Sequence, residues 1–433
     1  MSKENKKEKN AENGEKDLKK YSYLLIVLCW IVYACSYIGK LGYNANIIQI
    51  ENAFNISHAE SGTVSSFFFF AYGAGQIING LFCKRYNLKY VVFGGLILSG
   101  ISNILIGVVT NFEIVKYLWV INGGALSVLW VSLIRFLSET LDKKYMSKAV
   151  VVMGTTVATG TFLVYGLSAL FVALKVFKLI FFMAGILLPV IAITWFISSP
   201  LLAKKLRSGQ LSNEIESKDF KKGEDNVEIK RKGSMKNLWG IFIIFGIYAI
   251  MTNLIKDGLT TWVPIVLKDI YGLPDYISIL LTLLLPLCAI FGATVVVTLN
   301  KKIKNFVSIC TILFTVSCIL IGIVITMLHF NIFIVAVISF AIIACSMQGT
   351  NNLITSVMPL YWKDKINSGM VAGIFNGCCY IGSMISSYGL GLIADLYGWN
   401  FVFWLLFFVC FVAVVIGISE FIIRVIKGKQ RGK

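Results

Sequence analysis

Long apolar runs separated by short polar segments divide most of the chain. A helix needs about 20 mainly apolar residues to cross a bilayer, and twelve runs reach roughly that length. They lie near residues 22–50, 61–83, 90–109, 114–138, 147–174, 176–198, 238–267, 276–299, 306–328, 331–361, 366–394 and 399–424. The pattern predicts an all-α membrane protein with 12 transmembrane helices.

One long polar segment divides the twelve runs into two sets of six. We expect a polar tail at residues 1–20, a six-helix bundle at 21–198, a basic linker at 199–237, a second six-helix bundle at 238–424 and a tail at 425–433. The basic linker is expected to face anionic lipid headgroups. The alternative is a regulatory segment that binds a partner.

Composition agrees with a lipid environment. The chain is 57% hydrophobic and only 14% charged, whereas soluble domains carry roughly 25% charged residues. The net charge of +18 suggests nucleic acid or a membrane surface, and the positions of the charges decide between them.

Lys and Arg residues alternate between the two sides of the predicted membrane. If both termini are cytoplasmic, 33 of the 40 lie in cytoplasmic segments, four lie on the opposite side and three lie inside spans. Positive residues gather in cytoplasmic loops of membrane proteins. The charges therefore support twelve spans with cytoplasmic termini in the cell membrane, and no nucleic-acid partner.

Few residues are available for metal or catalytic chemistry. All ten cysteines lie in or beside apolar runs without C-x-x-C spacing, so we expect buried free thiols. The two histidines, His58 and His329, fall in predicted loops. We expect no metal site, no cofactor and no enzyme activity, and no cleavable signal in the charged first segment.

Two lysines lie inside spans at similar depths. Lys40 and Lys256 each begin a Lys-x-Gly triplet in the first span of their half. A charge in hydrocarbon costs about 2.5 kcal/mol or more. If the halves are parallel repeats, the two ammonium groups face each other across one central cavity. The alternatives are snorkelling, or pairing of Lys256 with Asp257, which we expect to be poorly placed because adjacent helical residues point about 100° apart.

Two converging cations suit a doubly anionic phosphate. In an empty site the ammonium groups would repel each other, which favours exchange of one anion for another. Asp257 is the only plausible deep acid, and this scarcity argues against proton symport without excluding it.

Other polar residues are candidates for the same cavity, with helix packing as the alternative for each. The predicted substrate-binding residues are Lys40, Lys256, Tyr43, Asn44, Gln76, Thr260, Trp262, Asn376 and Tyr380. The residues predicted to act in gating or structure are Arg135, Glu139 and Asp257. Arg135 and Glu139 have the i,i+4 spacing of a helical salt bridge.

Over nearly all of residues 21–424, the chain resembles the major facilitator superfamily. Within it, the chain is most similar to organophosphate:phosphate antiporters, the glycerol-3-phosphate and hexose-phosphate transporters. Residues 33–40, 254–264 and 370–399 carry the resemblance. It implies a major facilitator fold of two six-helix bundles, and it places the family's two phosphate-binding arginines on Lys40 and Lys256.

The sequence departs from the family pattern at four places. Lysines replace both arginines and lack their bidentate fork. Gln76 stands where the family has a lysine, Val157 stands near its histidine, and the loop at residues 80–85 lacks the usual acid. These departures leave open another phosphorylated compound, a phosphonate or a carboxylate as substrate.

We therefore expect a monomeric secondary active transporter that works by rocker-switch alternating access. Its cargo would be a small organic anion, an organophosphate of the glycerol-3-phosphate or sugar-phosphate type, exchanged for inorganic phosphate. The alternatives are a transporter-like membrane receptor for phosphorylated compounds, and a proton-coupled carboxylate or drug transporter.

Overall fold

The computed structural model describes residues 3–82, 85–217, 239–330, 332–361 and 368–431, and these residues are helical apart from short turns. The N-terminal half comprises α1 (Lys3–Ala45), α2 (Ile47–Phe54), α3 (His58–Phe82), α4 (Leu88–Val108), α5 (Phe112–Ser127), α6 (Leu129–Thr140), α7 (Lys143–Gly154), α8 (Thr156–Ala173) and α9 (Leu179–Ser217). The C-terminal half comprises α10 (Trp239–Tyr271), α11 (Asp275–Thr282), α12 (Leu284–Ala289), α13 (Gly292–Ile303), α14 (Phe306–Phe330), α15 (Phe333–Asn352), the π-helical turn η3 (Leu353–Val357), α16 (Met358–Tyr361) and α17 (Ser368–Arg431).

By length and composition, ten helical stretches of the described residues could cross a membrane. One of them, Val371–Ile423, has 53 residues, which is about 80 Å of helix and far more than a bilayer requires. The chain turns within it at Gly398, whose φ of 80° is left-handed. α3 is not among the ten, because serines and other polar residues dilute its apolar character. The count of twelve spans stays a prediction.

Several predicted spans contain a loosened turn without losing their direction. Val128 joins α5 to α6, and Thr155 joins α7 to α8, both with right-handed helical backbone. The predicted run 22–50 is interrupted near its end, because α1 stops at Ala45 and α2 begins at Ile47. The Asn46 amide between them donates to the carbonyl of Gly42 at 2.9 Å and so competes with continued helix.

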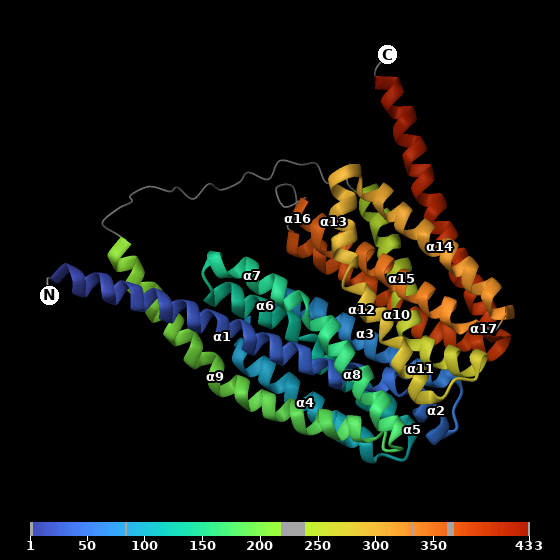
Figure 1. The fold of residues 1–433 in the computed structure, drawn as a ribbon, viewed down its shortest axis with the longest axis horizontal. Helices are drawn as coiled ribbons and strands as arrows, with labels where there is room; N and C mark the ends of the chain where they lie inside the picture. The colour runs from blue at the N-terminus through green and yellow to red at the C-terminus, as the bar shows by residue number, and fades with distance from the viewer. Residues whose placement is uncertain (1–2, 83–84, 218–238, 331, 362–367, 432–433) are drawn as a thin grey trace.

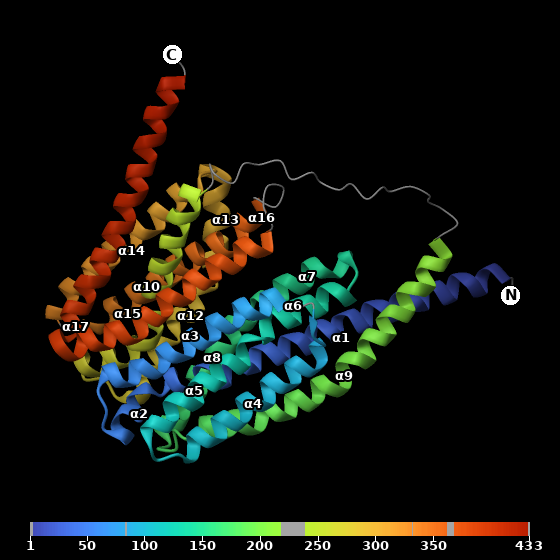
Figure 2. The same ribbon diagram turned by 180° about the vertical axis from the view of Figure 1, so that it is seen from behind.

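The predicted domain boundaries stay predictions, and parts of them fall elsewhere in the helices. α1 begins inside the predicted tail, and α9 continues into the predicted linker as far as Ser217. The remainder of that linker, residues 218–237, lies outside the described residues. α1 and α9 extend together beyond the bundle (Figures 1 and 2). The two helices are linked by the Lys205 ammonium, which donates to the Tyr21 hydroxyl at 3.1 Å.

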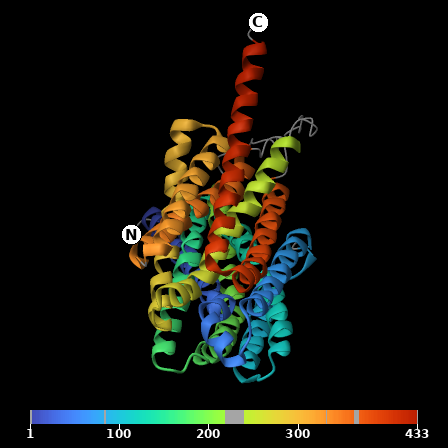
Figure 3. The same ribbon diagram turned by 90° about the vertical axis from the view of Figure 1, so that its right-hand side faces the viewer.

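The helices of the two halves come together at one end and spread apart toward the other (Figure 1). We call the first of these the joined end; it contains α2, the start of α3, the end of α10, α11 and the Gly398 turn of α17. The C-terminal part of α17 extends from the opposite end, beyond the other helices (Figure 3). The molecule is thus two helical bundles fastened together at one end.

Small residues let α3 and α17 pack closely across the two halves. A Cβ atom on Gly62 would lie 2.1 Å from the Ser387 carbonyl oxygen, and one on Gly73 would lie 2.8 Å from Tyr380 Cβ. Backbones in membrane bundles approach most closely where residues are small. The nine cysteines in the described residues are free thiols, as predicted, but burial was predicted correctly only for Cys29, Cys310, Cys379 and Cys410, and the other five are half-buried.

Candidate functional site: a joined end and a central cluster

The start of α3 is capped by a residue of the other half. The first N–H groups of a helix lack intrahelical partners and favour an anion. Here the Asp395 carboxylate of α17 accepts from the backbone N–H of His58 at 3.1 Å and of Ala59 at 2.7 Å. This cap fixes the N-terminus of α3 against α17, close to the turn at Gly398.

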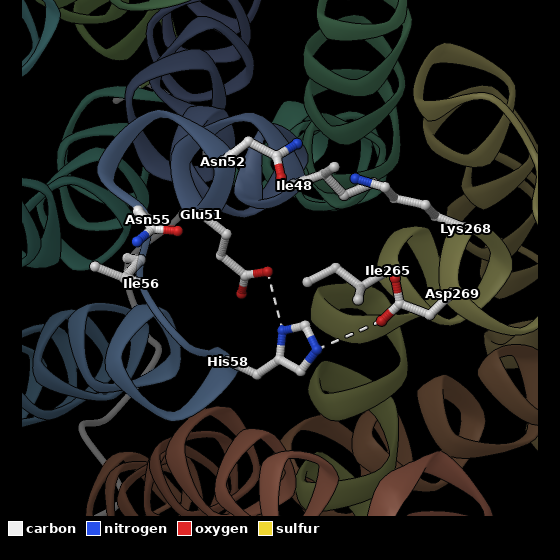
Figure 4. Close-up of a pocket in the computed structure, with 9 residues that line it drawn as sticks. All are labelled: Ile48, Glu51, Asn52, Asn55, Ile56, His58, Ile265, Lys268 and Asp269. Carbon is white, nitrogen blue, oxygen red and sulfur yellow. Dashed lines mark hydrogen bonds and ion pairs between the residues drawn. The ribbon is translucent and has the colours of Figure 1, made fainter.

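The imidazole of His58 lies between two carboxylates (Figure 4). Its Nδ1 is 2.9 Å from Glu51 Oε2 in the same half, and its Nε2 is 3.4 Å from Asp269 Oδ2 in the other half. Burial acts to lower the pKa of His58, but its hydrogen bonds to Asp269 and Glu51 prevail and raise the pKa to about 10. At neutral pH the ring is therefore protonated and donates on both sides.

Two tryptophans pack against the His58 ring. The Trp399 indole N–H donates to the same Asp269 carboxylate at 3.0 Å, and its ring centroid lies 5.3 Å from that of His58. Trp262 packs against both rings, with centroids 5.9 Å from His58 and 5.8 Å from Trp399. We call Glu51, His58, Asp269, Asp395 and Trp399 the joined-end network.

A cavity of about 280 Å³ opens beside this network. Its lining residues come from α2, the α2–α3 turn, the start of α3 and α10 (Figure 4), and they are Ile48, Glu51, Asn52, Asn55, Ile56, His58, Ile265, Lys268 and Asp269. Its lining residues on α10 lie about 14–20 Å along that helix from Lys256. It is a vestibule at the joined end and does not include the predicted anion site.

A layer of hydrogen bonds between the halves separates the vestibule from Lys40 and Lys256. The Asn44 amide donates to the Thr261 hydroxyl at 3.0 Å, and the Tyr165 hydroxyl donates to the Thr260 carbonyl oxygen at 2.8 Å. Both threonines lie about one turn beyond Lys256 toward the joined end. The two bundles are therefore fastened to each other almost down to the level of the lysines.

Lys40 lies at the interface between the halves among aromatic rings. Its ammonium nitrogen is 4.0 Å from the ring centroid of Tyr72 and 5.2 Å from that of Tyr37. The Tyr72 ring packs against Tyr380 of the other half, with centroids 5.1 Å apart. Such rings attract a cation through their negative faces. In the described part of the chain no carboxylate lies within ion-pairing distance of this ammonium.

Lys256 has a different environment, and one expectation about it is wrong. Its ammonium nitrogen lies 3.4 Å from Asp257 Oδ1, although the two are adjacent on α10. The flexible four-carbon stem of lysine lets the ammonium turn back to its neighbour. The second Asp257 oxygen accepts a short hydrogen bond from the Ser383 hydroxyl of α17. Asp257 is also near enough to Lys40 of the other half to attract its charge.

The other predicted substrate-binding residues divide into three groups. Tyr43 and Trp262 are buried in packing: the Tyr43 hydroxyl donates to the Ser61 carbonyl oxygen at 3.2 Å, and the Trp262 indole donates to that of Ser386 at 3.3 Å. Asn44 and Thr260 belong to the layer described above, and Tyr380 belongs to the lysine environment. Gln76 and Asn376 are half-buried, and a substrate role for them stays a prediction.

Arg135 and Glu139 form the salt bridge that their spacing predicts, with Nε and Oε1 2.6 Å apart. Both belong to α6 in the N-terminal half. A gating role for this pair stays a prediction.

Sequence reasoning missed several residues. His58 begins α3 and His329 lies at the end of α14, not in loops. Asp395, Tyr37 and Tyr72 were not singled out either. Tyr37 stands one helical turn before Lys40 in the sequence, so that spacing is the signal that could have identified it. We call Tyr37, Lys40, Tyr72, Lys256, Asp257, Tyr380 and Ser383 the central cluster.

Curated relatives match parts of the chain. A stretch of 99 residues is 30% identical to "Membrane sensor protein UhpC" of Escherichia coli (strain K12), covering 23% of each chain. A stretch of 138 residues is 24% identical to "Probable hexose phosphate transport protein" of Chlamydia pneumoniae, covering 31% of this chain and 30% of that one. The matches thus span less than a third of these relatives, and they confirm the likeness to hexose-phosphate transporters drawn from the sequence.

Solved structures and a family sequence model cover far more of the chain. A bacterial homologue of the human lysosomal transporter Spinster superposes with a TM-score of 0.70 at 13% identity over 87% of this chain and 83% of that one. The nucleoside transporter NupG superposes with a TM-score of 0.65 at 14% identity over 93% and 99%. These likenesses show the fold. Because the sequence model of the Major Facilitator Superfamily also matches residues 29–387, the chain belongs to that superfamily of membrane transporters.

Proposed function

We propose that this protein is a secondary active transporter of a small organic anion, an organophosphate of the glycerol-3-phosphate or sugar-phosphate type, which it exchanges for inorganic phosphate. The observation that carries the proposal is the central cluster. In it Lys40 of the N-terminal half lies over Tyr72, whose ring packs on Tyr380 of the other half, and Lys256 of that other half is paired with Asp257. Cations inside membrane spans mark substrate pathways.

The joined-end network supports transport by alternating access. It fastens α2 and α3 to α10 and α17 through contacts of a single histidine and a single helix cap. Such a small set can separate and re-form as the two bundles rock around the central cluster. With cytoplasmic termini and a location in the cell membrane, the joined end would face outward. The protein would then be closed to the outside, with its central cluster reached from the cytoplasm.

The likeness to named hexose phosphate transport proteins supports the cargo class, and so do two lysines where that family has arginines. Phosphate binds lysine as a point charge. Tyrosine hydroxyls from both halves would supply hydrogen bonds to the remaining phosphate oxygens. The working unit would be a monomer in the bilayer, without a cofactor.

A transporter-like receptor is the second candidate, because the stretch of 30% identity belongs to a protein named as a membrane sensor. A receptor of this kind would bind the same anions without moving them. The central cluster alone serves both functions, and flux distinguishes them.

Counterflow tests both candidates. The purified full chain is reconstituted in proteoliposomes preloaded with inorganic phosphate and challenged with labelled phosphate, glycerol-3-phosphate and hexose phosphates. We expect uptake that requires internal phosphate. Lys40→Gln and Lys256→Gln should abolish it, whereas Lys116→Gln, which removes an ammonium paired with Glu113 at 2.6 Å, should not. Binding without flux would favour the receptor, and normal uptake in both site variants would overturn the proposed site.

A further inference from the structure

The two lysines of the central cluster are unequal. Lys40 lies over tyrosine rings and has no carboxylate partner in the described part of the chain. Lys256 is paired with the adjacent Asp257 carboxylate at 3.4 Å. An incoming anion can therefore bind the Lys40 ammonium directly, whereas the charge of the Lys256 ammonium is already neutralised by Asp257.

We propose that Asp257 is an internal counter-anion that competes with the substrate for Lys256 and so determines which charge the site accepts. This inference rests on the proposed function, because it assumes that the central cluster binds an anion. It assigns Asp257 a role in specificity beyond the gating or structural role expected from the sequence.

The geometry suits a reversible competitor. One Asp257 oxygen faces Lys256, and the other accepts from Ser383, so the carboxylate stays in place when the lysine turns away. The pair is only partly buried, with 19% of the Lys256 side chain and 21% of the Asp257 side chain exposed. An anionic head can therefore reach the ammonium, and the carboxylate can recapture it when the head departs.

Four helices contribute a titratable group to this balance. The titratable groups that sense its charge are Lys256 on α10 itself, Lys40 and Tyr37 on α1, Tyr165 on α8, and Cys379 and Tyr380 on α17. The two lysines are the cations of this set and Asp257 is its carboxylate.

The charge balance defines the preferred substrate class. Two ammonium groups and one carboxylate leave a single positive charge, which an anion with one negative charge neutralises. A dianion would leave excess negative charge beside Asp257, and like charges in such a site repel strongly. The site is therefore selective for singly charged heads, such as a phosphodiester or a phosphate monoester that carries one proton.

Competition with two ions of permanent charge tests this selectivity. Labelled inorganic phosphate is bound to the full chain in detergent at pH 7 and displaced by dimethyl phosphate, which carries one charge, or by sulfate, which carries two. The ratio of their inhibition constants is compared between the wild type and Asp257→Asn. Using that ratio cancels size differences between the competitors.

We expect Asp257→Asn to shift the ratio toward sulfate by about tenfold or more, since removing a nearby like charge has effects of this size. Asp257→Ser should shift it in the same direction, and it provides a second route if the first variant folds poorly. Asp275→Asn is the matched control: it removes a carboxylate 3.5 Å from Lys268 at the joined end and should leave the ratio unchanged.

The outcomes separate the two proposals. An unchanged ratio in an Asp257 variant that still binds phosphate overturns the role of Asp257 and leaves the proposed function standing. Failure of the wild type to bind phosphate overturns the proposed function, and this inference with it. A shift of equal size in Asp275→Asn also overturns the inference, because it would show a long-range effect of net charge.

Discussion

His58 of the N-terminal half and Asp269 of the C-terminal half form the one charged side-chain contact of the joined-end network that crosses between the bundles, with Nε2 and Oδ2 3.4 Å apart. Because Glu51 holds the other ring nitrogen, the histidine acts as a positive link between two carboxylates. This contact between the halves therefore depends on the proton of His58.

Removing this link should favour the form in which the halves separate there. Hydrogen bonds to charged groups contribute about 1.5–3 kcal/mol, so His58→Gln should raise the population of the separated form by about tenfold or more. Spin labels attached at the starts of α3 and α11 measure the distance between the halves by double electron–electron resonance. An unchanged distance distribution in His58→Gln would show that packing alone holds the joined end.

The pH dependence of the same contact follows from its pKa. His58 has an ordinary pKa of 6.5 and a pKa of about 10 in the joined form, so the joined form binds the proton more tightly. Its contribution is fully present below about pH 6.5 and is lost as pH rises through about 10. The spin-label distances should thus shift toward the separated form between pH 7 and 10, and His58→Gln should not show this shift. A wild-type population that is constant over this range would contradict the assigned proton.

Asp395 should matter through helix capping. Replacing a good N-cap group costs about 0.5–2 kcal/mol, and here both accepted N–H groups belong to the opposite half. Asp395→Ala should lower the thermal midpoint and loosen the joined end, whereas Asp395→Asn should keep part of the cap through its amide oxygen. Amide hydrogen exchange at the start of α3 measures the difference, and equal protection in all three proteins would exclude a capping role.

The two parts of the site differ in how far the sequence reveals them. Lys40 and Lys256 stand out in the sequence because charges are rare in apolar spans. In the structure Asp257, the residue beside Lys256, is near enough to Lys40 to act on it electrostatically. The His58–Asp395 contact joins positions 337 residues apart, at the start of α3 and inside α17, close to ends of apolar runs where polar residues are ordinary. No local pattern indicates that pairing, because it exists only once the bundles have packed.

The pairing of Lys256 with Asp257 was misjudged for a related reason. Helical geometry fixes the directions of the Cα–Cβ bonds, so the side chains of adjacent residues start out pointing apart, and the expectation considered only these directions. The long lysine side chain can reverse that divergence, and Ser383 on α17 holds the carboxylate where the ammonium can reach it. The position of Ser383 relative to α10 depends on tertiary packing, which residue spacing along α10 does not describe.

Close packing of α3 on α17 gives a prediction that involves no charge. A Cβ on Gly62 would lie 2.1 Å from the Ser387 carbonyl oxygen, and backbone cannot yield as a flexible side chain would. Gly62→Ala should therefore push the helices apart near the joined end and destabilise the described conformation by about 1–3 kcal/mol. The matched control is Gly94→Ala in α4, where a Cβ would meet nothing within 4 Å and where alanine favours the helix by about 1 kcal/mol.

Thermal unfolding in detergent and the spin-label distances should show Gly62→Ala loosened at the joined end and Gly94→Ala unchanged or slightly more stable. Equal behaviour of the two variants would mean that α3 and α17 do not meet at Gly62.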